Sequence, residues 1–166
     1  MIHACSSDDA EKMVLLINEG ADANGLTSRG KTFLRIACEN GSFECVKKLI
    51  EYGVDISDKR HNRYYRRDVN KDTLAGTLCR HNRYKCLKLL MVEGGKSYVP
   101  LCNKECCNNE FKTSLDINSK NESGKTPYEI AYNEGYIGCC LDLSRHGGYL
   151  NGCDEYGHLI ESEYKY

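Results

Sequence analysis

The sequence has no tryptophan, only two prolines and no long apolar run. Apolar stretches such as Val14–Ile17 fall far short of the roughly 20 residues that a membrane-spanning helix needs, so we expect no membrane span. The low proline count excludes collagen-like and Pro-rich chains. Residues 1–9 contain neither a basic start nor an apolar stretch, which argues against a secretory signal and indicates a protein of the cytoplasm or the nucleus.

Catalytic signatures are also missing. The sequence contains no nucleophile elbow, no phosphate-binding loop and no dinucleotide-binding glycine pattern, and its five histidines are scattered. We therefore expect a protein without enzymatic activity and without a cofactor. The eleven cysteines are an odd number, and without an export signal we expect them to be reduced thiols.

Charge is nearly balanced over the whole chain but not along it. Residues 1–58 carry 6 Lys/Arg and 10 Asp/Glu, residues 59–88 carry 10 and 2, and residues 89–166 carry 7 and 12. The net charges of these segments are therefore −4, +8 and −5. A basic band lies between two acidic ends, a pattern that bears on binding partners rather than on fold.

The sequence repeats itself with a period of about 33 residues. The motif GADAN at residues 20–24 returns as GVDIS at residues 53–57, and the Ala-Cys pair at positions 4 and 5 returns at positions 37 and 38. The fullest unit is residues 30–53, GKTFLRIACENGSFECVKKLIEYG. Two further copies follow at wider spacing, which implies an insertion between Asp55 and Thr73 and a longer one between Gly94 and Asp116.

Each unit predicts two helices. Thr32, Thr73 and Thr126 stand where a hydroxyl caps the first helix, and Pro127 suits a first helical position. Gly41 favours a tight turn before the second helix. Apolar residues at helical spacing give each helix one face to bury. One pair has too little apolar surface to fold alone, so the pairs must stack.

These features resemble the ankyrin repeat, whose units begin with a T-P-L-H-x-A-like motif. Residues 125–131, KTPYEIA, are the nearest match, and residues 20–24 are similar to the family's G-A-D-V-N loop. The resemblance covers essentially the whole chain. It implies an all-α ankyrin-repeat solenoid, a single domain of about four helix-turn-helix units with short hairpin loops and two insertions.

The expected units are residues 1–24, residues 25–57, residues 58–95 with a basic loop insertion, and residues 96–150 with a cysteine-rich insertion. Residues 151–166 are expected to form one more partial loop and a tail. Gly76 departs from the repeat pattern, and because glycine costs about 1 kcal/mol against alanine inside a helix, we expect it to weaken the third unit.

The resemblance implies a non-catalytic adaptor that binds another protein through its concave face and its loops. One loop carries the run DKRHNRYYRRD at residues 58–68. Arginine donates planar, bidentate hydrogen bonds to carboxylates, and tyrosine supplies rigid contact area, so we expect an acidic partner. The residues expected to contact it are Arg35, Asn40, Lys59, Arg60, Arg63, Tyr64, Tyr65, Arg66, Arg67, Arg80, His81, Glu129 and Asn133.

Other interpretations stay open. The basic run is also compatible with a solvated loop or a nuclear-import signal, and residues 59–88 suit binding to nucleic acid or an anionic lipid surface. The acidic remainder of the chain opposes a long nucleic-acid track. A metal- or redox-responsive module would use Cys102, Cys106 and Cys107, although their C-x3-C-C spacing matches no standard zinc motif.

Six other cysteines recur at repeat positions. One position is shared by Cys5, Cys38 and Cys79, and another by Cys45, Cys86 and Cys139. Recurrence at positions between helices favours small core residues over reactive thiols.

Asn24 lies in a loop that resembles the one that asparaginyl hydroxylases modify in ankyrin-repeat proteins, which makes it a candidate modification site. The alternative is that its side chain hydrogen-bonds the loop backbone.

Small proteins made of ankyrin-like units with irregular insertions resemble those of large DNA viruses and intracellular pathogens, which bind host proteins as adaptors or decoys. A eukaryotic adaptor fits the resemblance equally well. The sequence does not indicate an oligomeric state.

Overall fold

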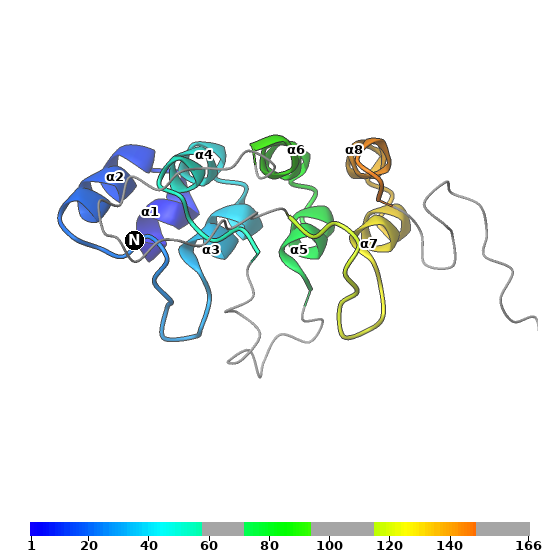
Figure 1. Cartoon of the computed structure of the whole chain (residues 1–166), viewed down its shortest axis with the longest axis horizontal. Helices are drawn as coiled ribbons and strands as arrows, with labels where there is room; N and C mark the ends of the chain where they lie inside the picture. The colour runs from blue at the N-terminus through cyan, green and yellow to red at the C-terminus, as the bar shows by residue number, and fades with distance from the viewer. Residues whose placement is uncertain (58–71, 94–114, 149–166) are drawn as a thin grey trace, which may run out of the picture.

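The computed structural model describes residues 1–57, 72–93 and 115–148, and these residues form eight helices in two layers (Figure 1). One layer contains α1 (Ile2–Ser7), α3 (Phe33–Asn40), α5 (Leu74–Arg80) and α7 (Pro127–Asn133). The other contains α2 (Ala10–Asn18), α4 (Phe43–Glu51), α6 (Tyr84–Glu93) and α8 (Ile137–Arg145). The expected all-α solenoid of helix pairs is confirmed. Each helix pair falls within one of the four units predicted from the sequence. The exact boundaries of these units stay a prediction.

The predicted helix starts are confirmed by their hydrogen bonds. The hydroxyl of Thr32 accepts from the backbone N–H of Arg35 at 3.1 Å, and Thr73 and Thr126 do the same at the starts of α5 and α7. At α7 the carboxylate of Glu129 also accepts from the N–H of Thr126 at 2.8 Å, which completes a capping box. These bonds satisfy donors that a helix start otherwise leaves without a partner.

The core lies between the two layers and contains the six recurrent cysteines. Cys5, Cys38, Cys45, Cys79, Cys86 and Cys139 are all buried, together with aliphatic residues such as Leu49, Leu87 and Leu90. The helix α1 packs on α3, α3 on α5 and α5 on α7, so each unit covers the apolar surface that the next unit turns toward it. The prediction of cysteines as small core residues is confirmed.

Close packing favours glycine at two positions of this stack. Gly41, with φ +75°, ends α3, and a Cβ there would lie 2.8 Å from Cδ of Arg83. Gly76 lies inside α5, where a Cβ would come within 3.1 Å of Cδ1 of Ile130 in α7. Glycine lowers the helix propensity at position 76, but it also allows α5 to approach α7 closely, which a larger residue would oppose.

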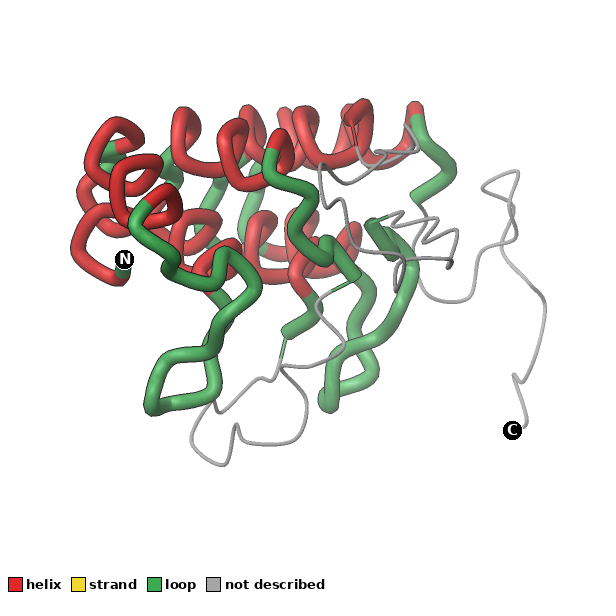
Figure 2. Tube along the Cα trace, turned by 60° about the vertical axis from the view of Figure 1, so that its left-hand side comes forward, coloured by secondary structure: helices red, strands yellow, loops and turns green. Residues whose placement is uncertain are grey.

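Hairpin loops extend from the layer of α1, α3, α5 and α7 (Figure 2). In the loop before α3, the N–H of Thr27 donates to the carbonyl of Lys31 at 2.9 Å. In the loop before α7, the N–H of Asn121 donates to the carbonyl of Lys125 at 3.0 Å. The two loops occupy equivalent places in their units and thus close with the same hydrogen bond.

Candidate protein-binding face

The face formed by α1, α3, α5, α7 and the hairpin loops carries the predicted binding residues that the structure describes, and we call it the inner face. Six of the thirteen predicted residues lie on it within the described chain: Arg35, Asn40, Arg80, His81, Glu129 and Asn133. The other seven, namely Lys59, Arg60, Arg63, Tyr64, Tyr65, Arg66 and Arg67, lie outside the described residues. The same holds for Cys102, Cys106 and Cys107 of the metal or redox interpretation.

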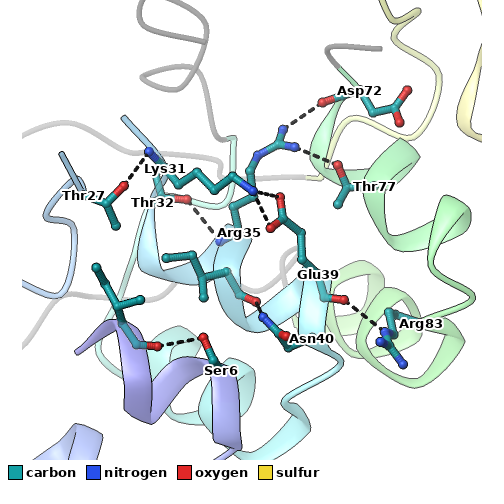
Figure 3. A network of polar contacts seen from close by, with 12 residues as sticks. Ser6, Thr27, Lys31, Thr32, Arg35, Glu39, Asn40, Asp72, Thr77 and Arg83 are labelled. Atoms are coloured by element: carbon teal, nitrogen blue, oxygen red, sulfur yellow. Dashed lines mark hydrogen bonds and ion pairs between the residues drawn. The ribbon is translucent and has the colours of Figure 1, made fainter. Parts of the chain in front are cut away.

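The expectation that Arg35 is exposed to a partner is wrong. Arg35 is 2% exposed, and its guanidinium donates to the hydroxyl of Thr77 at 2.7 Å and to the backbone carbonyl of Asp72 at 2.8 Å (Figure 3). A buried guanidinium must use its donors within the protein, and the adjacent unit supplies both acceptors here. Arg35 therefore joins the second unit to the third.

Asp72 is the centre of a polar cluster between three units. Its carboxylate, 7% exposed as a side chain, forms an ion pair with Arg80 at the end of α5. The same carboxylate accepts from Nδ2 of Asn121, in the loop before α7, at 2.7 Å. With the Arg35 contact to its carbonyl, Asp72 is held by the second, third and fourth units. Arg80 lies 4.0 Å from a carboxylate oxygen of Glu134 as well, so its charge is already compensated.

A related ion pair lies one unit earlier. Nζ of Lys31 contacts the carboxylate of Glu39 at 2.6 Å, and the backbone carbonyl of Glu39 accepts from Nε of Arg83 at 3.2 Å (Figure 3). Lys31 and Glu39 occupy the repeat positions of Asp72 and Arg80, so the two pairs bridge the same span with opposite polarity.

The remaining candidates differ in how free their side chains are. Asn40, His81 and Asn133 are exposed at the ends of α3, α5 and α7, although the amide of Asn40 donates to the carbonyl of Ile36 at 2.8 Å. Glu129 is half-buried and serves in the capping box of α7. The exposed polar candidates therefore follow the edge where each first helix turns into the second.

Both flanks of the basic insertion are anchored. Before it, Val54 and Ile56 are buried, and the carboxylate of Asp55 accepts from the N–H of Ser57 at 2.9 Å. After it, Asp72 is held in the cluster described above. The residues directly before and after the run 58–71 therefore have fixed positions in the structure.

Asn24 has a structural role in the loop between units. Its side-chain oxygen accepts from the N–H of Asp55 in the following loop at 2.9 Å, and its own N–H donates to the carboxylate of Asp22 at 2.9 Å. The interpretation that this side chain hydrogen-bonds loop backbone is confirmed. Modification of Asn24 stays a prediction.

The buried thiols are poorly suited to nucleophilic chemistry. Burial raises the pKa of Cys5 to about 11 and that of Cys86 to about 11. Burial, with the nearby Cys5 and Asp8, raises the pKa of Cys45 to about 12. At neutral pH these groups are protonated, and a protonated thiol is a weak nucleophile and a weak metal ligand. Within the described ranges, no three or more His, Cys, Asp or Glu side chains are placed to hold a metal ion.

Several of these residues were missed by the sequence analysis. Asp72, Thr77 and Asn121 carry contacts between units, and Lys31 and Glu39 form a pair within the second unit, but none of the five was selected as a candidate. A signal for two of the pairs was present, because oppositely charged residues recur eight positions apart across the first helix in two successive units. The contacts between units had no comparable signal.

A family model and a curated protein are similar to parts of this chain. Residues 1–60 match the family model described as ankyrin repeats (3 copies). A curated protein, the "Probable E3 ubiquitin-protein ligase XBOS32" of Oryza sativa subsp. japonica, is 26% identical over 154 residues, which cover 85% of this chain and 30% of the rice protein. The chain therefore spans less than a third of that relative's length.

The matched residues and the stacked helix pairs together define the class: the described residues fold as an ankyrin-repeat solenoid. Ankyrin repeats generally mediate protein–protein interaction and are generally not enzymes. Within the described residues, no helix combines the length and the apolar character needed to cross a membrane.

Proposed function

We propose that this chain is a non-catalytic adaptor that binds an acidic partner protein through its inner face and through the basic insertion at residues 58–71. The insertion contains six Lys/Arg and two Asp. The observation that carries the proposal is the anchoring of its flanks at Ser57 and Asp72. Because both flanks are held, the two ends of the basic run are attached at fixed points of the described structure.

The charges of the described inner face point to the insertion as the source of attraction. Lys31 is paired with Glu39, and Arg80 with Asp72 and Glu134. Basic side chains that are already compensated add little to the attraction of an acidic surface. Six of the ten Lys/Arg of the band 59–88 lie in the insertion, and by this proposal they steer and orient an acidic partner.

The proposal includes no ligase activity. The word ligase belongs to the name of the rice protein, of which this chain spans 30%. Cys5, Cys45 and Cys86 are buried and their pKa values are raised, so they are protonated at neutral pH, which supports a binding role rather than a covalent one.

The test is affinity capture from a eukaryotic lysate at about physiological salt, after nuclease treatment, with bound proteins identified by mass spectrometry. The wild-type chain is compared with the triple variant Arg63→Glu, Arg66→Glu and Arg67→Glu. The matched control is Lys47→Glu, Lys85→Glu and Lys88→Glu, which changes the net charge equally at exposed positions of α4 and α6, in the other helix layer.

We expect one defined protein to bind the wild type and the control but not the triple arginine variant. Purified partner should then bind with an affinity that weakens as salt is raised. Equal loss with both triple variants would show a non-specific charge effect and contradict the proposal. In a parallel capture without nuclease, binding that nuclease treatment removes would favour nucleic acid as the ligand of residues 59–88.

A further inference from the structure

Arg83 directly precedes α6, and its side chain lies against the end of α3 in the second unit. Its Nε donates to the backbone carbonyl of Glu39 at 3.2 Å (Figure 3). A Cβ at Gly41 would lie 2.8 Å from Cδ of Arg83 and 3.1 Å from its Cζ, so the guanidinium rests directly on the glycine. The half-buried arginine is therefore held both by packing and by one hydrogen bond.

The terminal nitrogens of this guanidinium remain unused within the described chain. Across residues 1–57, 72–93 and 115–148, Arg83 makes no ion pair and no hydrogen bond besides the one to Glu39. Arg35 and Arg80, by contrast, donate to acceptors of neighbouring elements. A planar guanidinium that is already held in place offers two parallel donors to a carboxylate, and little side-chain freedom is lost on binding.

The first unit carries a carboxylate at the position where the second unit has Gly41. This residue is Asp8, whose Oδ1 accepts from the N–H of Cys45 in the following unit at 3.0 Å. At the next junction Gly41 supplies no side chain, and Arg83 brings a positive charge to the same edge of the stack. The first junction therefore contains its own carboxylate, whereas the second presents a cation that lacks one.

The residues around Arg83 do not compete for its charge. Asn40, His81 and Asn82 are exposed, and none of them is acidic. The carboxylate of Glu39 is already bound by Nζ of Lys31 at 2.6 Å. Asn40 and His81 were predicted to contact a partner, so Arg83 lies on the edge that the sequence analysis had selected.

We propose that the guanidinium of Arg83 binds a carboxylate side chain of the acidic partner, and that Gly41 positions it for that contact. This inference rests on the proposed function, because it names a contact with the same partner in the described part of the chain. The insertion steers the partner, and the bidentate contact to Arg83 fixes the partner's register. Binding therefore depends on the position of the guanidinium as well as on its charge.

The test measures the binding of a fluorescein-labelled decaglutamate peptide to the full chain at low salt, by fluorescence anisotropy. Arg83→Gln removes the guanidinium. Its matched control is Arg145→Gln, which removes an exposed arginine of α8 in the other helix layer. Circular dichroism checks that each variant keeps its helices.

A second pair of variants tests the positioning role. Gly41→Ala keeps every charge but places a methyl group where Arg83 lies. The matched control is Gly135→Ala at the same repeat position of the fourth unit. Gly135 has φ +74°, against +75° for Gly41, and a Cβ there would meet nothing within 4 Å. Both variants therefore strain the backbone equally, and only Gly41→Ala displaces the guanidinium.

We expect Arg83→Gln to weaken binding of the peptide by about tenfold, because a charge-assisted bidentate contact is lost. Gly41→Ala should weaken it by roughly threefold, and both controls should stay within about twofold of the wild type. If Arg83→Gln lost no more affinity than Arg145→Gln, only net charge would matter and the proposal would be overturned. Equal affinities for Gly41→Ala and Gly135→Ala would overturn the positioning role.

The triple arginine variant of the insertion, measured in the same assay, separates this inference from the proposed function. Loss of binding in the triple variant but not in Arg83→Gln would refute this inference and leave the proposed function standing. Loss in Arg83→Gln but not in the triple variant would refute the role proposed for the insertion and support the contact at Arg83. Displacement of the peptide by inorganic phosphate but not by acetate, at equal ionic strength, would overturn the assignment of a carboxylate.

Discussion

Arg80 forms an ion pair with Asp72 across the first helix of the third unit, with the charges exchanged relative to Lys31 and Glu39 of the second unit. The two pairs differ in burial. The side chain of Asp72 is 7% exposed, whereas that of Glu39 is 21% exposed. The carboxylate of Asp72 also accepts from Asn121, which links the pair to the fourth unit.

Replacement of the two carboxylates should therefore have unequal effects. Asp72→Asn replaces the buried carboxylate that binds Arg80 and Asn121 by a neutral amide. The free energy of unfolding should therefore fall by about 1–3 kcal/mol. Glu39→Gln acts on a more exposed pair and should cost about 0–1 kcal/mol. Urea unfolding of both variants measures the difference. Equal losses would show that the three-unit cluster adds nothing beyond a surface ion pair.

Burial of Arg35 gives a second prediction. Arg35→Met keeps an unbranched apolar side chain in place of the arginine stem but leaves the hydroxyl of Thr77 and the carbonyl of Asp72 without their donors, at a cost of about 2 kcal/mol or more in unfolding free energy. Arg29→Met is the control, because Arg29 is exposed in the loop before α3. If Arg35→Met were as stable as the control, the proposed junction between the second and third units would be wrong.

Gly76 gives a prediction whose sign depends on packing. In an exposed helix Gly→Ala stabilises by up to about 1 kcal/mol. Here the new methyl group would lie 3.1 Å from Cδ1 of Ile130, so Gly76→Ala should destabilise the chain by about 1–3 kcal/mol.

The double variant Gly76→Ala with Ile130→Val tests the cause, because the second change removes the atom that the new methyl meets. It should be more stable than the sum of the single effects, as thermal or urea unfolding would show. Simple additivity would mean that the contact with Ile130 is not the obstacle.

The buried thiols predict a loss of stability at alkaline pH. The pKa of Cys45 is raised from 9.0 to about 12 and that of Cys86 from 9.0 to about 11, so the folded state holds protons that the unfolded state has lost. This stabilisation is complete below pH 9 and disappears as pH rises through the folded-state values. Under reducing conditions, the free energy of unfolding should decline from about pH 9 upward.

The variant Cys86→Ala separates this effect from the ionisation of tyrosine and lysine. It loses some stability at every pH because it leaves a small cavity, but its decline above pH 9 should be shallower than that of the wild type. Parallel curves for the two proteins would show that Cys86 does not contribute to the pH dependence.

The repeat period alone was enough to predict the helix pairs and much of the core. Threonine caps, turn glycines and the recurrent cysteines act within one unit or at equivalent places of neighbouring units, so their pattern is visible in the sequence. The candidate face was less predictable. Arginine is a residue type typical of partner-binding surfaces. Nothing within α3 reveals that the guanidinium of Arg35 donates hydrogen bonds to Thr77 and Asp72.

The sequence by itself determined that this chain is a stack of ankyrin helix pairs with a basic insertion, because helix periodicity and capping are local properties that recur from one unit to the next. Only the tertiary structure decided which polar residues stay exposed and which join the units. Asp72 follows the insertion yet meets Arg35, 37 residues earlier, and Asn121, 49 residues later. Such contacts depend on how neighbouring units stack, and the distance along the chain does not encode that geometry.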